Sequence, residues 1–195
     1  MPQGPGGDPP EGVLDGVAPE RRRALLALAR EAARRAVEGS EPPGIPGSLT
    51  DLKEPVAAFV TVRALDGTLR GCMGECPARR PLPECVRKVA AHAALDDPRF
   101  DPLTPADLPS VRFEISVLSE FRAVEAEEVE VGRHGLFLQS PRGTGLLLPQ
   151  VPTANGWDRW QFLAALCAKA GVEPGEWDRP DAVLKSFEAD VWEET

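Results

Sequence analysis

Histidine and long apolar runs are scarce in this 195-residue sequence. The two histidines, His92 and His134, fall on separate predicted elements, so neither is placed as the base that a cysteine nucleophile commonly uses. No stretch approaches the roughly 20 apolar residues of a membrane-spanning helix. The N-terminus also lacks the basic start and apolar core of a signal peptide. We therefore expect a cytoplasmic protein with no membrane partner.

Cysteine occurs four times, at Cys72, Cys76, Cys85 and Cys167. Cys72 and Cys76 have a spacing that zinc tolerates, but the other two do not form the second pair of a four-ligand site. No glycine-rich phosphate loop and no Ser-His-Asp set is present either. We expect reduced thiols, no metal and no cofactor.

Positive charge is in deficit, with a net charge of −9 and a pI near 4.8. Nucleic-acid affinity depends on clustered lysine and arginine that contact phosphates, so the charge argues against a general nucleic-acid binder. The hydrophobic content of 42% and the charged content of 27% are ordinary for a packed protein. The length suits one domain.

Composition divides the chain into a tail and a folded part. Residues 1–17 are rich in glycine and proline and nearly free of apolar side chains, so we expect a disordered tail followed by one domain over residues 18–195. Helical periodicity predicts helices over about 19–38, 82–95 and 157–170. Trp157 and Trp160 share one face of the third helix, which predicts that they lie in the core.

Strand patterns occur at about 56–62, 68–74, 111–118, 135–140, 145–151 and 187–191. The strand over 111–118 alternates apolar and polar residues, which is typical of a half-buried strand. Pro149 and Gln150 end another strand, and Gln150 offers both a donor and an acceptor. Because strands and helices do not alternate as βαβ units, the pattern favours an α+β fold with antiparallel sheets.

Asp66-Gly67 separates the first two strands and is a strong hairpin signal. A two-residue loop would pair Arg63 with Arg70 and Thr61 with Cys72, and directly opposed residues share a face. The alternating set Val60, Val62, Ala64, Leu69, Gly71 and Met73 would then face the core.

Two interpretations of the polar face remain open. Arg63 opposite Arg70 is unfavourable unless an anion lies between them, either Glu114 or a ligand. Arg70 would also favour the thiolate of Cys72 and make it nucleophilic. The alternative is a charged sheet face that carries a small, inert cysteine. Glu114 is then either an ion-pair partner or a general base.

Six segments in order resemble the AMMECR domain family. They are Leu69-Arg70-Gly71-Cys72-Met73-Gly74, with Met73 where the family usually has isoleucine, then Asp96 to Leu103, Phe113 to Ser119, Val131 to Leu136, Leu147 to Val151, and Gly156-Trp157-Asp158. Lys169-Ala170-Gly171 also follows in the family's order. The resemblance covers about residues 20–193. In bacteria, such domains are often called AmmeMemoRadiSam system protein A.

The resemblance implies two unequal subdomains, each with an antiparallel sheet flanked by helices, and a cleft between them. We place the large subdomain at about 18–122 plus 181–195 and the small one at about 123–180. The resemblance also implies that the Leu69–Gly74 strand faces the cleft and that Memo-like and radical-SAM-like proteins are partners. The candidate catalytic residue is Cys72, and the candidate substrate-binding residues are Arg63, Arg70, Gly71, Gly74, Asp97, Arg99, Glu114 and Gln150.

Asp97 and Arg99 either bind substrate or stabilise the turn around Pro98. For the whole protein we consider three functions. The first is a module that binds an anionic small molecule or a protein segment in the cleft, and the second is a cysteine-dependent enzyme at the same place. The third is a role with RNA, against which the charge argues.

Overall fold

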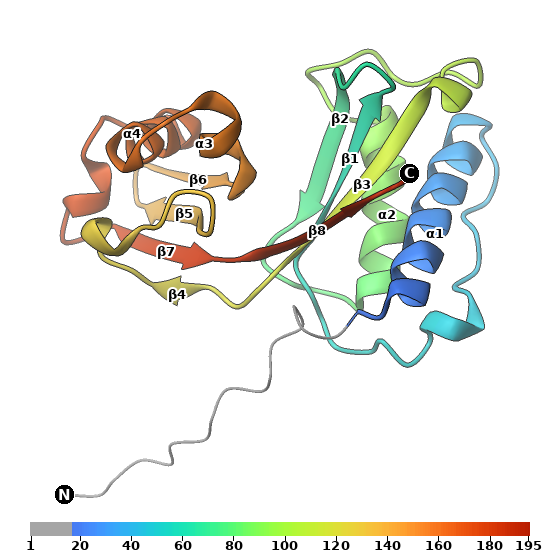
Figure 1. The fold of residues 1–195 in the computed structure, drawn as a ribbon, viewed down its shortest axis with the longest axis horizontal. Coiled ribbons are helices and arrows are strands. Elements are labelled where there is room, and N and C mark those ends of the chain that lie inside the picture. The colour runs from blue at the N-terminus through green and yellow to red at the C-terminus, as the bar shows by residue number, and fades with distance from the viewer. Residues whose placement is uncertain (1–16) are drawn as a thin grey trace, which may run out of the picture.

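The computed structural model describes residues 17–195, and the prediction of a disordered N-terminal tail concerns residues that lie almost entirely outside this range. Val17, which the prediction assigned to the tail, is buried. Two four-stranded antiparallel sheets, each with helices packed on it, form two lobes (Figure 1). The predicted α+β class is confirmed. Within residues 17–195, no helix has the length and apolar character that crossing a bilayer requires.

The large lobe is built on a sheet of strand order β2-β1-β3-β8. Helices α1 and α2 pack on one face of this sheet and share one core with it. That core consists of side chains from the apolar stripes of both helices and from alternate positions of the strands. The elements are α1 (Pro19–Val37), β1 (Ala58–Ala64), β2 (Leu69–Glu75), α2 (Leu82–Leu95), β3 (Val111–Leu118) and β8 (Ala189–Glu193), with short 3₁₀ turns at Gly47–Leu49 and Leu108–Ser110.

The small lobe has the strand order β4-β7-β5-β6, and a second core lies between this sheet and helix α4. Asp158 caps α4 by accepting a hydrogen bond from the backbone N–H of Gln161, and Gly171 ends the helix with a positive φ. The elements are β4 (Arg122–Ala123), β5 (Gly135–Ser140), β6 (Gly143–Leu147), α3 (Gln150–Asn155), α4 (Arg159–Ala170) and β7 (Val183–Phe187), with 3₁₀ turns η4 (Ala126–Glu128) and η5 (Glu176–Asp178).

The chain crosses between the lobes twice, once between β3 and β4 and once at Glu188 between β7 and β8. The backbone N–H of Ser119 donates to the carbonyl of Glu188 at 2.9 Å, which joins the two crossings. An apolar cluster that includes Leu118, Phe187 and Phe137 fills the junction. The two lobes are thus connected by paired strands and a small core of their own.

Three boundaries differ from the sequence prediction. The strand predicted at 187–191 is two strands, and β7 belongs to the small sheet, so the predicted return to the large subdomain near residue 181 comes too early. The strand predicted at 145–151 ends at Leu147, and Gln150 begins α3 instead of ending a strand. The helix over 82–95 and the strand over 111–118 were predicted correctly.

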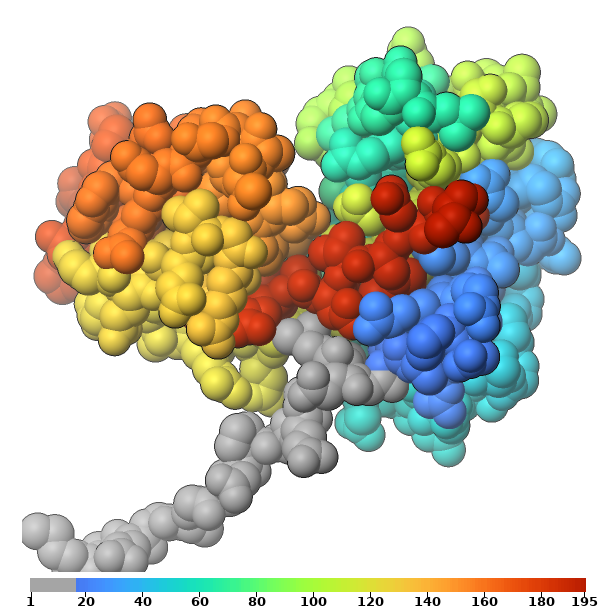
Figure 2. Space-filling view, viewed as in Figure 1, coloured from blue at the N-terminus to red at the C-terminus, as the bar shows by residue number. Residues whose placement is uncertain are grey.

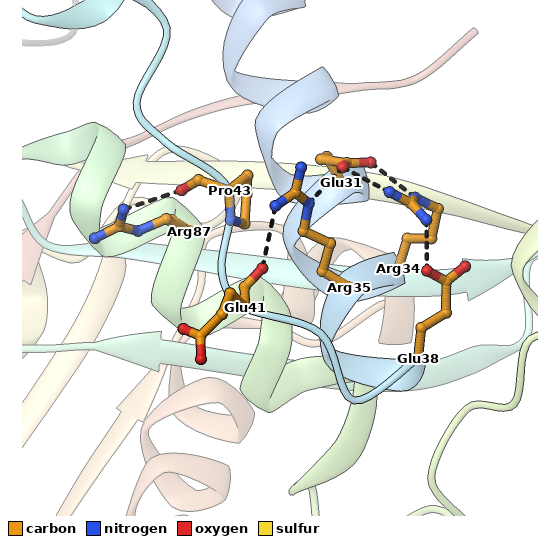
Figure 3. A network of polar contacts seen from close by, with 7 residues as sticks. All are labelled: Glu31, Arg34, Arg35, Glu38, Glu41, Pro43 and Arg87. Carbon is orange, nitrogen blue, oxygen red and sulfur yellow. Dashed lines mark hydrogen bonds and ion pairs between the residues drawn. The ribbon is translucent and has the colours of Figure 1, made fainter.

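A proline-rich loop follows α1, as the sequence predicted, and arginine side chains fasten it to both helices (Figure 3). Arg35 donates to the carbonyl of Glu41 at 3.3 Å, and Arg87 donates to the carbonyl of Pro43 at 3.0 Å. Glu31 holds Arg35 in place at 2.7 Å. The loop is therefore held along a defined path beside α1 and α2.

Candidate functional site

The β1–β2 hairpin has a three-residue loop, Leu65-Asp66-Gly67, where the sequence predicted two residues. The N–H of Ala64 donates to the carbonyl of Thr68 at 2.8 Å, and the N–H of Gly67 donates to the carbonyl of Ala64 at 2.9 Å. Gly67 has φ of 90°, a conformation that glycine adopts without strain. This is the common turn in which a left-handed glycine completes a three-residue loop.

A β-bulge at Arg70 offsets the extra loop residue. Arg63 pairs with Leu69 and Val62 pairs with Gly71, so Arg70 has no residue opposite it on β1. The predicted pairing of Arg63 with Arg70 is therefore wrong. Beyond the bulge the predicted register is confirmed, with Thr61 opposite Cys72 and Phe59 opposite Gly74.

The covered face of the large sheet is the apolar face that packs on α1 and α2. Val60, Val62 and Phe113 are fully buried there. Gly71 lies where α2 crosses β2, and a Cβ atom built on it would lie only 2.0 Å from the carbonyl oxygen of Ala93. Only glycine fits this position, because the contact is with helix backbone that has no rotamer to change.

The opposite face of the sheet carries polar residues, and we call it the open face, defined by Thr61, Arg63, Cys72, Arg112, Glu114 and Glu193. Strand pairing places Cys72, Thr61, Glu114 and Glu193 in one row across all four strands. Arg63 and Arg112 form the next row. Figure 2 shows an open gap between the β1–β2 hairpin (teal) and the small lobe (orange and yellow), with the C-terminal strands (red) along its floor.

Arg63 and Arg112 lie directly opposite each other on β1 and β3. The nearest carboxylate of Arg63 is Glu114, at 3.8 Å between Nε and Oε2. Arg112 donates to the carbonyl of Leu65 at 3.0 Å. A small hollow of about 130 Å³ lies beside both guanidinium groups and is bordered by Glu114 and Glu193. Two arginines and two glutamates thus border the hollow, and the ion pair found among them in the described chain is the long one between Arg63 and Glu114.

Burial raises the pKa of Glu114, Arg63 opposes this rise, and Glu193 across the strand adds to it. The side chain of Glu114 is 15% exposed. A carboxyl group in this position takes up a proton more readily than one on the surface.

Arg70 points away from the arrangement predicted for it. Its Nη1 lies 3.6 Å from Oδ1 of Asp107, in the segment that follows α2. Glu114, the predicted partner of Arg70, instead pairs with Arg63. The bulge explains the difference, because it turns Arg70 out of the regular alternation of the strand.

Arg99 is the cation beside Cys72. It donates to the Cys72 carbonyl at 3.2 Å and to the carboxylate of Asp97 through Nε and Nη2, at 2.9 and 2.7 Å. The buried Asp97 in turn accepts the backbone N–H of Cys72 at 2.8 Å. Because β2 is an edge strand, the Asp97–Arg99 pair satisfies the backbone groups that face away from β1. Asp97 Oδ1 also accepts the backbone N–H of Arg99 at 3.2 Å, so the pair holds the turn around Pro98 as well as the edge of β2.

The thiol of Cys72 lacks the surroundings of an activated nucleophile. Burial raises its pKa, and the hydroxyl of Thr61, 3.3 Å from Sγ, and the charge of Arg99 only partly oppose the rise. His92 pairs with Asp96 at 2.9 Å, and Nδ1 of His134 accepts the N–H of Glu130 at 3.1 Å. Neither histidine is thus engaged with Cys72. Among residues 17–195, no three histidine, cysteine or acidic side chains converge as metal ligands.

A sequence profile of the AMMECR1 family matches residues 26–192. The chain belongs to the AMMECR1 family. It is 37% identical to Protein MK0488 of Methanopyrus kandleri over 179 residues, covering 87% of this chain and 86% of that protein. It is 39% identical to Protein TK0174 of Thermococcus kodakarensis over 183 residues, covering 87% and 88%.

A solved structure of the same fold is the crystal structure of an uncharacterized protein, PH0010, from Pyrococcus horikoshii. The TM-score is 0.79 at 36% identity, and the match covers 87% of this chain and 89% of that one. The family resemblance and the α+β class predicted from the sequence are both confirmed. For this AMMECR1-family member, the relatives supply a fold and a family.

The structure brings together only part of the predicted site. Arg63, Cys72 and Glu114 meet on the open face, while Gln150 begins α3 in the small lobe. Among the described residues, no hydrogen bond joins Gln150 to the open face, and its buried Oε1 atom has no partner. Arg112 was missed, although the alternation over 111–118 already placed it on the same face as Glu114.

Proposed function

We propose that this AMMECR1-family protein is a non-catalytic binding module whose open face holds an anionic group. The group would belong to a small molecule or to a protein segment that enters the gap between the lobes. The observation that carries the proposal is the direct opposition of Arg63 and Arg112, with one carboxylate at 3.8 Å.

Like charges in directly opposed positions of neighbouring strands destabilise a sheet. Surface arginines usually relieve this by pairing closely with carboxylates, but the one ion pair of Arg63 in the described chain is long, and Arg112 bonds to a backbone carbonyl. A carboxylate or phosphate between the two guanidinium groups would accept charge-assisted hydrogen bonds from both. Arginine suits this role because its planar guanidinium matches the geometry of such anions.

The neighbouring row supplies less charged contacts. The partly buried thiol of Cys72 lies there and accepts the hydroxyl of the buried Thr61, and the half-buried ring of Phe59 lies in the next row along β1. The raised pKa of Glu114 lowers the cost of bringing an anion close to it, since the carboxyl group can bind a proton. This combination suits a ligand with an anionic end and a less polar body.

Cysteine-dependent catalysis at the same place is the alternative. The raised pKa of Cys72 and the engagement of both histidines elsewhere favour binding over this chemistry. We therefore assign Cys72 to the wall of the binding surface.

The proposal is tested by NMR titration of the ¹⁵N-labelled protein with inorganic phosphate, N-acetyl-alanine and the uncharged N-acetyl-alanine amide. We expect the two anions to shift backbone signals of β1 and β3, and the amide to leave them unchanged. Arg63→Gln and Arg112→Gln should each weaken anion binding by roughly tenfold, the effect of losing one charge-assisted contact. The matched control is Arg79→Gln, an exposed arginine in no ion pair of the described chain, which should bind like the wild type. Equal responses in all three variants, or no response to either anion, would refute the proposal.

The Memo-like and radical-SAM-like proteins implied by the family resemblance are the first partners to assay if the ligand is a protein segment. We propose that a segment of such a partner places a carboxylate between Arg63 and Arg112. Co-purification with the wild type but not with the Arg63→Gln, Arg112→Gln double variant supports this. Equal recovery with both proteins places the contact elsewhere.

A further inference from the structure

A second hollow, of about 300 Å³, lies in the small lobe and has no residue in common with the open face. One wall is the segment from β4 into η4, and the opposite wall is the turn that contains η5. The start of α4 contributes Trp160, and Leu184 of β7 lies at the hollow as well. Its volume is at the lower end of the range for small-molecule sites, which suits a group the size of one long side chain.

Two indole rings line this hollow. The sequence predicted a core position for Trp160, but its side chain is 51% exposed, so that prediction was wrong. Trp177 is partly buried and packs against the small-lobe core. Among the exposed large apolar residues of the described chain, Trp160 is the one aromatic. A tryptophan left half uncovered beside a hollow has an unused ring surface, and tryptophan offers the most favourable ring for a cation.

Three carboxylates, Glu125, Glu127 and Asp178, line the same hollow, and none of its lining residues is cationic. Glu127 and Asp178 are exposed, and their side chains take part in no ion pair or hydrogen bond in the part of the chain that the structure describes. Elsewhere in this lobe arginines pair closely with acidic residues, as Arg142 does with Asp181 at 2.5 Å. The negative charges of Glu127 and Asp178 at the hollow therefore have no cationic partner among the described residues.

Both walls are held in place by contacts behind them. Glu176 is 1% exposed in its side chain and is gripped by Arg142 at 2.6 Å and by Arg179 at 3.2 Å. This fixes the η5 turn, which presents Trp177 and Asp178 to the hollow. On the other wall, a reciprocal capping box between Glu125 and Glu128 fixes η4. A site with walls fixed before binding loses less conformational entropy when a ligand enters.

We propose that this hollow binds an organic cation, a guanidinium or alkylammonium group on an aliphatic stem the length of an arginine or lysine side chain. The indole rings would contact the face of the cation and its stem, and the carboxylates would accept its N–H groups. A metal ion fits less well, because the acidic residues here do not converge as a ligand set among the described residues. The site would select its ligand by the charge and shape of one basic group.

The test follows the indole N–H signals of the ¹⁵N-labelled protein, assigned with Trp160→Phe and Trp177→Phe. Nα-acetyl-arginine amide and Nα-acetyl-lysine amide represent a side chain on a protein, and spermidine represents a free polyamine. We expect saturable shifts of the Trp160 and Trp177 signals with at least one of these cations, and the probe with the highest affinity identifies the source. Nα-acetyl-citrulline amide has nearly the shape of the arginine probe without its charge and should cause no saturable shift.

Variants separate this site from non-specific attraction to an acidic protein. Trp160→Ala and Asp178→Asn should each weaken binding of the best cation by roughly tenfold. Glu173→Gln removes one exposed charge from the same lobe outside the hollow and should bind like the wild type. The proposal is overturned if the citrulline probe binds as tightly as the cations, if no cation shifts either signal, or if Glu173→Gln weakens binding as much as Asp178→Asn.

Discussion

The two faces of the large sheet are built from alternate residues of the same strands, yet they differ in almost every respect. The covered face is apolar, mostly buried and closed by α1 and α2. The open face carries two arginines, two glutamates, a threonine and a cysteine, and no helix within residues 17–195 packs on it. The difference shows that one short strand, Leu69–Glu75, meets two demands at once, because successive side chains of a strand point to opposite faces.

A pair of matched glycine substitutions gives the largest expected contrast between the faces. Gly71→Ala places a methyl group against the backbone oxygen of Ala93 on the covered face, where nothing can move aside without shifting α2. We expect a loss of about 3 kcal/mol in the free energy of unfolding, the upper range for overpacking a core. Urea denaturation followed by circular dichroism measures it.

Gly74→Ala is the comparison on the other face. A Cβ atom at Gly74 would meet the ring of Phe59 at 2.2 Å, but this ring is a half-buried side chain that can rotate. We expect a loss of about 1 kcal/mol. If both variants lost the same stability, the open face would be as tightly packed as the covered one, and the distinction between them would fail.

The sequence predicted the contrast between the faces better than it predicted the hairpin that creates it. Alternation and the Asp66-Gly67 signal were enough to place Val60 and Val62 on one face of the sheet and Thr61 and Cys72 on the other. The loop length and the bulge at Arg70 were missed, and each shifts the register by one residue in opposite senses. The two errors cancel, which is why the pairing predicted for Thr61 with Cys72 and for Phe59 with Gly74 is correct. Local sequence does not show a bulge, which depends on how the loop meets its surroundings.

The second prediction concerns the edge strand β2, which contributes to both faces. Here Asp97 binds Arg99 and the backbone N–H of Cys72. Asp97→Asn keeps the shape of the side chain but loses its charge, so we expect a loss of about 2 kcal/mol at pH 7. The hydrogen bonds from Arg99, aided by the backbone N–H of Cys72, lower the pKa of Asp97 from 3.8 to about 2, although burial opposes this.

The pH dependence of stability follows from that pKa. A carboxylate with a lowered folded pKa contributes stability above its unfolded value, and the contribution is lost as the pH falls from about 4 to about 2. The wild type should therefore lose more stability over this range than Asp97→Asn does. The control is Asp101→Asn, an exposed aspartate whose side chain has no hydrogen-bond partner among the described residues. Parallel pH curves for the wild type and Asp97→Asn would contradict the assignment.

The smallest expected effect is on the reactivity of Cys72. In a Cys76→Ser background, where Cys85 and Cys167 are buried, we expect Cys72 to react with iodoacetamide more slowly than a cysteine in a short peptide at pH 8. The reason is that burial raises the pKa of the thiol, so less thiolate is present. Mass spectrometry measures the rate. A reaction faster than that of the peptide would support cysteine-dependent catalysis and contradict the proposal that the open face is a non-catalytic binding surface.

The ionic partners were harder to predict than the strands. The sequence suggested Arg70 for both Cys72 and Glu114, but Arg99 lies beside Cys72 and Arg63 pairs with Glu114. Arginine side chains are long, and their partners depend on the tertiary path of loops such as the one after α2. The division at β7 was missed for a similar reason, since one residue, Glu188, separates two strands that belong to different sheets.

This arrangement of β7 and β8 has a consequence for how the protein folds. β7 lies inside the small sheet, between β4 and β5, and β8 completes the large sheet beside β3. Both strands belong to the single segment from Val183 to Glu193. Neither sheet is complete without this segment, and β5 then lacks its partner on one side. The two lobes therefore reach their final form together, because one continuous segment completes both sheets.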